Sequence, residues 1–146
     1  MFLDLKSLRR SGKDSQSFFY EYSPEKDLID IPNTKLDLPV KISGEVTLTG
    51  MQSAFISGEI AFTLTGECTR CLSSVTREYV AEFDEQVEEN NPDGYSVVND
   101  TVDLGKIVED AILINLPVSF LCKEDCKGIC LNCGVNLNED SCKCKN

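Results

Sequence analysis

Alternating apolar and polar residues dominate the middle of the chain and predict three consecutive β-strands. The alternation runs through residues 40–49, 54–65 and 75–88, and turn residues separate the runs. A period of two is typical of a strand that buries one face. The expected inward-facing residues are Val40, Ile42, Gly44, Val46, Leu48, Ala54, Ile56, Gly58, Ile60, Phe62, Leu64, Val75, Tyr79, Ala81, Phe83 and Val87. Three such strands in series predict an antiparallel meander with one solvent-exposed face.

A helical period follows the third run and predicts one main helix over about residues 103–115. Its apolar positions recur at i, i+3, i+4, i+7 and i+8, and they are Leu104, Ile107, Val108, Ala111 and Ile112. Asp103 is a natural N-cap, and Pro117 ends the run. The neighbouring acids Glu109 and Asp110 are expected on the solvent face of this helix.

Weaker strand signals lie at residues 2–5, 18–22, 28–31 and 95–98. Together these patterns predict an α+β fold, in which a β-rich antiparallel meander packs with one main helix. The expected organisation is a core domain over 1–117, followed by a small Cys-rich zinc-binding segment over 118–146 that packs on the core.

The composition of the chain directs attention to metal chemistry. The chain has 146 residues, eight cysteines and no histidine. It shows no signal-peptide pattern and no run approaching about 18 apolar residues, so we expect a cytoplasmic protein without a membrane partner. In a reducing compartment disulfides rarely persist, and closely spaced cysteines more often bind metal. Without histidine, a zinc site must be built from thiolates, with a carboxylate as the other common ligand.

The cysteines fall into two predicted metal sites. The stretch Cys130-Leu-Asn-Cys133-Gly134 has the spacing of a zinc knuckle, because the two-residue gap lets both sulfurs face one ion and glycine tolerates a positive φ. The first predicted site consists of Cys130, Cys133, Cys142 and Cys144. The second, which would clamp the tail onto the meander, consists of Cys68, Cys71, Cys122 and Cys126. We therefore expect one or two Zn²⁺ per chain.

Other interpretations of the cysteines stay open. The Cys68-x-x-Cys71 pair has the spacing of a redox dithiol, but such dithiols lie at a helix N-terminus and this pair is flanked by predicted strands. An iron–sulfur cluster uses the same thiolate ligands as zinc. Buried free thiols are common in cores, although a polar tail is not core-like. Without histidine, Cys–His nucleophilic catalysis is excluded, and we expect no enzymatic activity.

Charge argues against a general nucleic-acid binder but leaves one local candidate. The net charge is −11, whereas residues 6–13 hold four cations and no acid. This basic stretch is either a solvated linker or an arm that contacts phosphates. The candidate RNA-binding residues are Lys6, Arg9, Arg10 and Lys13.

Several spaced motifs resemble the YceD family, the large ribosomal RNA subunit accumulation proteins of bacteria and plastids. These motifs are Glu67-Cys-Thr-Arg-Cys-Leu72, Asp103-Leu104, Val108-Glu-Asp110, Leu116-Pro117, the stretch CKGICLNCGVNLN and a closing Cys-x-Cys. The resemblance covers the chain from about residue 40 onward and is to the Gram-positive form with a Cys-rich tail. It implies a role in the accumulation or processing of large-subunit (23S) rRNA through binding of its precursor, and it carries over no catalytic residue.

Three functional hypotheses follow. The first is a non-enzymatic ribosome-biogenesis factor that binds precursor rRNA. The second is a zinc-stabilised protein-interaction module that binds a ribosomal or assembly protein without contacting RNA, which the net charge favours. A thiol oxidoreductase is a third. The sequence leaves the partner, the metal and the oligomeric state open.

Overall fold

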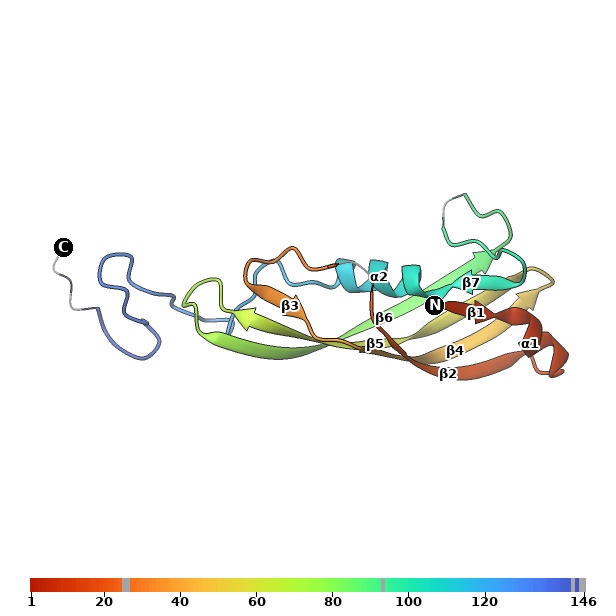
Figure 1. The fold of residues 1–146 in the computed structure, drawn as a ribbon, viewed down its shortest axis with the longest axis horizontal. Helices are drawn as coiled ribbons and strands as arrows, with labels where there is room; N and C mark the ends of the chain where they lie inside the picture. Colours follow the sequence, from red (N-terminus) through yellow and green to blue (C-terminus); the bar gives the residue numbers. More distant parts are fainter. Residues whose placement is uncertain (25–26, 93, 143, 145–146) are drawn as a thin grey trace.

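A long antiparallel sheet forms the body of the molecule in a computed structural model, which describes residues 1–24, 27–92, 94–142 and 144 (Figure 1). The strands of this sheet are β2 (Ser15–Tyr22), β3 (Thr34–Leu36), β4 (Val40–Gly50), β5 (Ser53–Glu67) and β6 (Ser74–Glu88). β5 is central and pairs with β6 along one edge, while β4 and then β3 cover its other edge. β2 pairs with the far side of β4. The three predicted strands are therefore confirmed as a β4–β5–β6 meander.

The apolar alternation of these strands faces one shared core. Ile42, Ile56 and Ile60 are fully buried, as are Leu64 and Val87. The polar residues between them point to the exposed side of the sheet. This arrangement confirms the predicted inward face and leaves one face of the sheet to solvent.

The helix α2 (Leu104–Ile114) lies along the inner face of the sheet (Figure 1). Asp103 caps it, because its side chain accepts a hydrogen bond from the backbone N–H of Lys106 at 3.2 Å. All five predicted apolar positions of the helix are buried. They pack with Phe120, which is also fully buried and which the sequence patterns did not single out. The predicted α+β class is confirmed.

The expectation that Glu109 and Asp110 lie on the solvent face of α2 is wrong. Both side chains are half-buried and accept hydrogen bonds from tyrosine hydroxyls. The Tyr22 hydroxyl donates to Glu109 at 2.6 Å, and the Tyr95 hydroxyl donates to Asp110 at 2.7 Å. Burial and the neighbouring Asp110 raise the pKa of Tyr95 above its usual range. The two carboxylates therefore hold the helix between β2 and the segment that precedes the helix.

The N-terminal region contains the strand expected at residues 2–5 and, after it, a helix that the sequence patterns did not predict. β1 (Phe2–Asp4) pairs antiparallel with β7 (Thr101–Asp103), in a second, two-stranded sheet. The basic stretch begins inside a helix, α1 (Leu5–Arg10), and is not a solvated linker. Leu5 and Leu8 are buried on one side of α1. These apolar anchors place the stretch firmly on the body of the protein.

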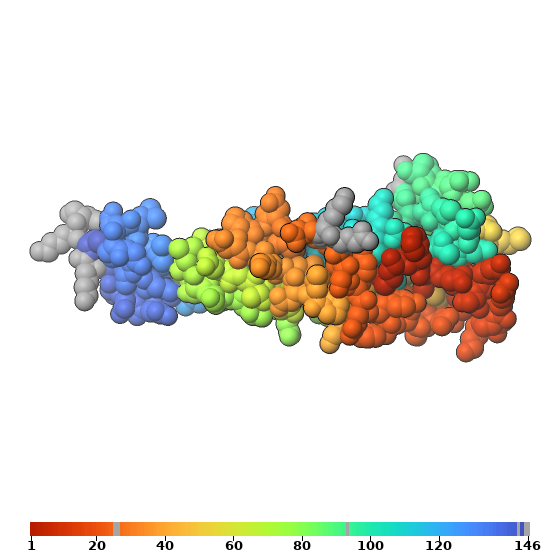
Figure 2. Space-filling model, viewed as in Figure 1, coloured from red at the N-terminus to blue at the C-terminus, as the bar shows by residue number. Residues whose placement is uncertain are grey.

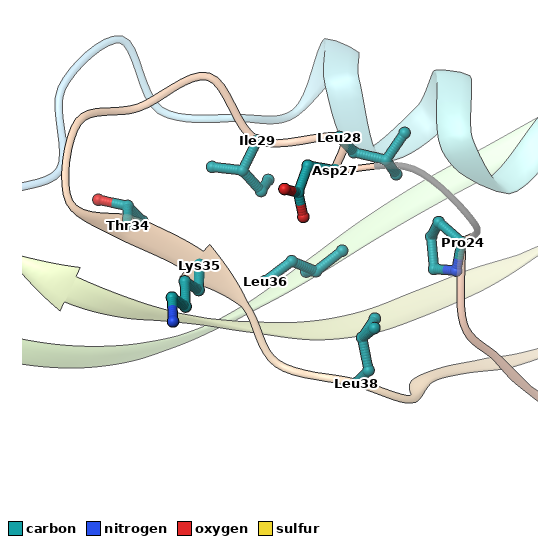
Figure 3. A pocket seen from close by; sticks show the side chains of 8 residues that line it. All are labelled: Pro24, Asp27, Leu28, Ile29, Thr34, Lys35, Leu36 and Leu38. Atoms are coloured by element: carbon teal, nitrogen blue, oxygen red, sulfur yellow. The ribbon is translucent and has the colours of Figure 1, made fainter.

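Two of the shorter strand signals are not realised as strands. Residues 28–31 are irregular, and β3 follows them instead. Residues 95–98 contribute only isolated bridges. The irregular segment borders a groove lined by Pro24, Asp27, Leu28, Ile29, Thr34, Lys35, Leu36 and Leu38 (Figure 3). None of these lining residues is a cysteine or a candidate RNA-binding residue.

The molecule is elongated, and its two candidate functional regions lie at opposite ends. The Cys-rich tail extends beyond the turn between β5 and β6, while α1 lies at the far end of the sheet (Figures 1 and 2). No helix in the described part of the chain is long and apolar enough to cross a membrane.

Candidate metal centre

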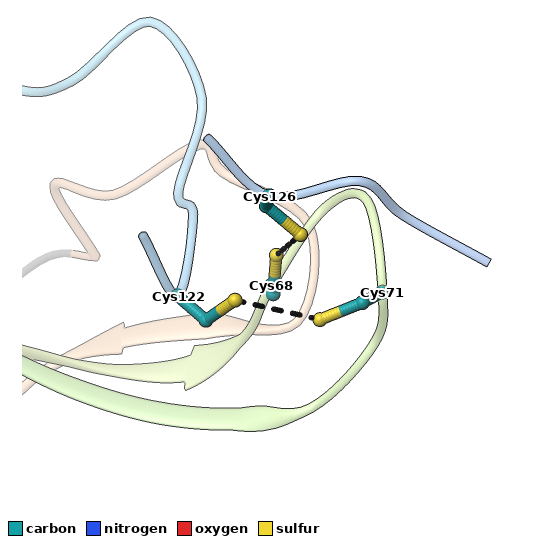
Figure 4. A group of neighbouring side chains, drawn as sticks. All are labelled: Cys68, Cys71, Cys122 and Cys126. Atoms are coloured by element: carbon teal, nitrogen blue, oxygen red, sulfur yellow. Dashed lines mark hydrogen bonds between the residues drawn. The ribbon is translucent and has the colours of Figure 1, made fainter. Parts of the chain in front are cut away.

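The first group of cysteines, here called the inner site, joins the sheet to the tail. Cys68 and Cys71 lie in the turn between β5 and β6, and Cys122 and Cys126 lie in the segment after Phe120 (Figure 4). Hydrogen bonds fix this segment against the sheet. The Thr69 N–H donates to the Phe120 carbonyl at 2.8 Å. The Arg70 guanidinium donates to the Cys126 carbonyl at 3.0 Å, and the Arg77 guanidinium donates to the Leu121 carbonyl at 3.1 Å.

The sulfur atoms of the inner site converge on one point. All four lie within 4.8 Å of one another, and the Cys68–Cys126 and Cys71–Cys122 Sγ pairs are each 3.6 Å apart. A zinc ion bound to four thiolates at about 2.3 Å places neighbouring sulfurs about 3.8 Å apart. Cys68, Cys71 and Cys126 are buried, whereas Cys122 is half-buried. These four cysteines can therefore hold a metal ion with little rearrangement.

Backbone amides prepare the inner site for negative charge. Burial raises the pKa of Cys68, but N–H groups of Cys71, Cys122 and Arg70 outweigh it and bring that pKa to about 6. The Ser73 hydroxyl lowers the pKa of Cys71. Burial and the neighbouring cysteines raise the pKa of Cys122 to about 12. A thiolate forms readily at Cys68, and further thiolates beside it need a cation.

The second group, here called the outer site, consists of Cys130, Cys133, Cys142 and Cys144. Its sulfurs also lie within 4.8 Å of one another. The Cys130–Cys144 and Cys133–Cys142 Sγ pairs are 3.9 Å apart, and the Cys130–Cys142 pair is 3.2 Å apart. Cys133 and Cys142 are exposed. The Cys-x-Cys spacing of the last pair thus does not keep either sulfur away from the group.

The outer site repeats the local geometry of the inner site. N–H groups of Cys133 and Asn132 bring the pKa of Cys130 to about 6, just as the amides of the β5–β6 turn act on Cys68. Gly134 has a φ of 75°, the left-handed conformation expected after the second cysteine of a knuckle. Neighbouring cysteines raise the pKa of Cys144 to about 12. Each Cys-x-x-Cys pair therefore supplies a prepared half-site that two further cysteines complete.

The chemistry of these donor sets favours a structural metal. Four thiolates close a tetrahedral coordination shell and leave no position for water or substrate. A reactive dithiol needs an accessible, electropositive cysteine, whereas Cys68 is 0% exposed. Four-thiolate coordination suits zinc and iron–sulfur clusters alike.

The four candidate RNA-binding residues are not equivalent in the structure. Lys6, Arg10 and Lys13 are exposed, but Arg9 is half-buried and forms an ion pair with Asp100. The sequence places that acid 91 residues away, so no local pattern could have indicated it. Lys123 and Lys127, on the segment that carries Cys122 and Cys126, are also exposed. The other two lysines of the tail, Lys143 and Lys145, lie outside the described residues.

Three polar residues beside the inner site escaped the sequence interpretation. No sequence pattern assigned Ser73, Asn136 or Asn138 to a site. In the structure Asn138 donates to the sulfur of Cys126, and Asn136 donates to Ser73, which contacts Cys71. The available signals were the position of Asn136 and Asn138 between the second and third cysteines of the outer site and the position of Ser73 two residues after Cys71.

Fold and site define a β-rich protein with two four-cysteine groups able to hold a metal, one shared between the β5–β6 turn and the tail and one within the tail. The chain belongs to the YceD family, because residues 56–146 match the family described as "Large ribosomal RNA subunit accumulation protein YceD". The match includes the β5–β6 turn, α2 and all eight cysteines. The resemblance drawn from the sequence motifs is thereby confirmed. The family name implies a role in rRNA accumulation and thus in ribosome biogenesis.

Relatives with sequence similarity occur in bacteria and plants. An uncharacterised protein of Mycobacterium tuberculosis is 37% identical over 97 residues, which is 59% of this chain and 46% of that protein. The chloroplastic YCED homolog 1, a large ribosomal RNA subunit accumulation protein of Arabidopsis thaliana, is 37% identical over 43 residues, which is 30% of this chain and 13% of that protein. The chain thus spans less than half the length of these relatives. No solved structure shows significant similarity.

Proposed function

We propose that this protein is a non-enzymatic ribosome-biogenesis factor that supports the accumulation or processing of large-subunit (23S) rRNA. The observation that carries this proposal is the family match over residues 56–146, because the family is named for that role. We further propose that the protein acts in the cytoplasm and binds the precursor of this rRNA. Its organisation would be a core over 1–117 and a metal-dependent tail over 118–146.

Zinc is the proposed metal, with one ion in the inner site and one in the outer site. The support is the donor set, since eight thiolates in two groups of four suit two closed tetrahedral sites. The Sγ–Sγ distances of 3.6 to 3.9 Å across most contacting pairs fit the separation of about 3.8 Å that such a site requires. When bound, zinc would neutralise thiolate charge and fix the tail on the β5–β6 turn.

The proposed RNA contact lies at α1 and the turn that follows it. Lys6, Arg10 and Lys13 are exposed there, whereas the ion pair of Arg9 with Asp100 commits that side chain to the fold. A contact that depends on exposed cations should weaken with salt, by a slope of about −0.7 for each phosphate on a single strand. We therefore assign Arg9 a structural part in presenting the three exposed cations.

A second candidate function, binding of a basic ribosomal or assembly protein without RNA contact, is favoured by the exposed face of the sheet. That face carries the exposed acids Glu45, Glu59, Glu67, Glu78, Glu82, Asp84 and Glu88. Glu59 and Glu82 lie directly opposite each other on β5 and β6. Like charges in this position are destabilising. No ion pair neutralises these acids within the described part of the chain, so a cationic partner would relieve their repulsion.

Variants of the two faces test both functions. Lys6, Arg10 and Lys13 changed together to Ser should abolish rRNA crosslinking in cells and reduce the salt slope in vitro by about 2. The matched control changes Lys35, Lys41 and Lys106, which are also exposed, to Ser and should crosslink normally. Cells lacking the protein should accumulate less large-subunit than small-subunit rRNA. Normal crosslinking by the first variant, with loss of a bound protein from a Glu59→Gln, Glu82→Gln variant, would favour the protein-interaction function instead.

A further inference from the structure

The loop that closes the outer site reaches back to the inner site. This outer loop, residues 134–141, runs between Cys133 and Cys142. Asn138 Nδ2 donates to the sulfur of Cys126 at 3.3 Å. Asn136 Nδ2 donates to the Ser73 hydroxyl at 3.3 Å, and that oxygen lies 3.2 Å from the sulfur of Cys71. Two of the four inner sulfurs are therefore contacted, directly or through Ser73, by residues of the outer loop.

The amide groups of these asparagines have fixed orientations. Asn138 Oδ1 accepts the backbone N–H of Lys127 at 2.9 Å, while its Nδ2 donates to Asn136 Oδ1 at 2.9 Å as well as to Cys126. Asn136 Oδ1 also accepts the backbone N–H of Asn138 at 2.9 Å. Exchange of the oxygen and nitrogen of Asn138 would oppose like partners at each of these contacts. The N–H that faces Cys126 is therefore imposed by the network.

The outer loop keeps this position by pairing with the segment between the two sites. The Leu137 N–H donates to the Gly128 carbonyl, and the Cys130 N–H donates to the Val135 carbonyl, each at 2.9 Å. Ligation of Cys133 and Cys142 by one ion would close the ends of the loop. Groups that donate to metal ligands typically change metal affinity by about 10- to 100-fold. Order in the outer site is thus linked to the environment of the inner sulfurs.

We propose that Asn136 and Asn138 are positioning residues that couple the two metal sites. A metal ion in the outer site holds the outer loop so that these amides support the Cys126 and Cys71 thiolates of the inner site. An ion in the inner site holds the same amides and so favours closure of the outer loop. This inference rests on the proposed binding of zinc and adds that the two ions bind cooperatively.

The first test removes the Asn138 donor without changing its shape. Asn138→Asp keeps an oxygen for the Lys127 N–H and replaces the donor that faces Cys126 with a carboxylate oxygen. Chelator competition on the full-length, zinc-loaded chain should show inner-site affinity reduced by about 10- to 100-fold. Zinc release to the chelator is expected in two phases, one for each site. The phase that belongs to the inner site is identified as the one missing from a Cys68→Ser, Cys71→Ser variant. With Co²⁺ as the probe, the thiolate-to-metal absorption of the inner site should also shift.

The matched control is Asn90→Asp, which makes the same chemical change at an exposed position just after β6, at the opposite end of that strand from the cysteine-bearing turn. It should leave inner-site affinity and the inner-site Co²⁺ absorption unchanged. Amide exchange over α2 checks that both variants keep the fold. Equal inner-site affinity in Asn138→Asp, Asn90→Asp and wild-type protein would overturn the proposal.

Reciprocity provides a second test. A coupling free energy between two sites acts equally in both directions. Inner-site affinity in a Cys133→Ser, Cys142→Ser variant should therefore fall by the same factor as outer-site affinity in the Cys68→Ser, Cys71→Ser variant. If the wild-type protein binds two zinc ions but neither site affects the affinity of the other, the proposed coupling is wrong and the proposed metal sites stand. Wild-type protein that takes up no zinc would overturn the proposed metal sites and the coupling with them.

Discussion

The inner and outer sites have the same ligands and the same local turn but very different surroundings. In each, the first cysteine of a Cys-x-x-Cys pair accepts backbone N–H groups and has a pKa of about 6. The Cys-x-x-Cys pair of the inner site lies between two 15-residue strands, and three of the four cysteines of that site are buried. The outer site has two exposed cysteines and only a short paired segment beneath it. The geometry of the cysteine ligands is thus set by the local turn, whereas the rigidity of each site depends on the strands and segments packed around it.

Because of this difference, a bound metal would order little of the chain at the inner site and much more of it at the outer site. The β5–β6 turn is held by the sheet, so an ion at the inner site needs to recruit only the segment that carries Cys122 and Cys126. The outer site has no comparable scaffold, and the free energy of metal binding must order its chain, as in small zinc domains. Four experiments, in decreasing order of expected effect, test this contrast.

The largest effect should follow from removal of the metal. Amide protons over residues 122–144 should lose their protection, because the tail then has too little apolar contact to oppose its conformational entropy. Protection over β4, β5, β6 and α2 should persist. Hydrogen exchange measured before and after verified chelation checks both statements. Unchanged exchange in the tail would show that it folds without metal.

Single cysteine substitutions should separate the two sites next. Cys126→Ser should lower zinc content by one ion and reduce Tm by several degrees, since each kcal/mol lost from a chain of this size costs about 2–4 °C. Cys142→Ser should also remove one ion but should lower the Tm of the sheet less than Cys126→Ser does, because Cys142 is exposed and acts on the inner site only through the proposed coupling. Metal analysis and calorimetry provide the measurements. Equal Tm values for the two variants would remove the distinction between a scaffolded and an unscaffolded site.

The elements that the sequence predicted well are those whose signal lies in a regular period. The β4–β5–β6 meander and α2 each bury one face, so the alternation of Val40 to Val87 and the stripe of Leu104 to Ile112 report the core directly. The division of the cysteines could also be predicted, because each Cys-x-x-Cys pair needs two more thiolates. The structure brings together the same two sets of four.

The elements that were missed depend on contacts between distant residues. Helix α1 was hidden by its cations, although Leu5 and Leu8 provide a short apolar side. Nothing near Glu109 indicates that Tyr22, 87 residues away, donates to it. Likewise the turn-forming appearance of Asn138 conceals a hydrogen bond to Cys126. Such tertiary partners override the local preference that sequence patterns report.

A smaller effect is expected from a change in the core that is remote from both sites. Tyr95→Phe removes the hydroxyl that donates to Asp110 at 2.7 Å. Loss of a hydrogen bond to a charged, half-buried acceptor should lower the free energy of unfolding by about 1.5 kcal/mol. Zinc content should not change, because α2 makes no contribution to either cysteine group. Denaturant unfolding combined with metal analysis tests this.

Tyr20→Phe is the matched control, since the Tyr20 hydroxyl forms no hydrogen bond among the described residues. It should leave stability within a few tenths of a kcal/mol of wild type. Loss of zinc from the Tyr95→Phe variant would mean that zinc binding at the cysteine sites depends on the stability of the core.

The smallest effect should come from alanine at the two glycines of the tail with positive φ. Gly134 (φ 75°) follows the outer knuckle, and Gly128 (φ 80°) lies between the sites. A Cβ at Gly134 would meet nothing within 4 Å, whereas one at Gly128 would lie 3.4 Å from the Arg70 carbonyl oxygen. The left-handed conformation costs alanine about 1–2 kcal/mol, partly offset by reduced entropy of the unfolded chain. Each variant should therefore lose about 1 kcal/mol, or about fivefold in zinc affinity at an affected site.

The two glycine variants should differ in which site loses zinc affinity. Gly134→Ala strains only the outer knuckle and should weaken zinc binding mainly at the outer site. Gly128→Ala strains the segment that joins the two sites beside Arg70, whose guanidinium holds the Cys126 carbonyl, and should weaken both. Chelator competition resolved into its two phases measures each loss. If Gly128→Ala affected the outer site alone, the connection between the sites would be flexible. The sheet would then scaffold the inner site without any help from the tail.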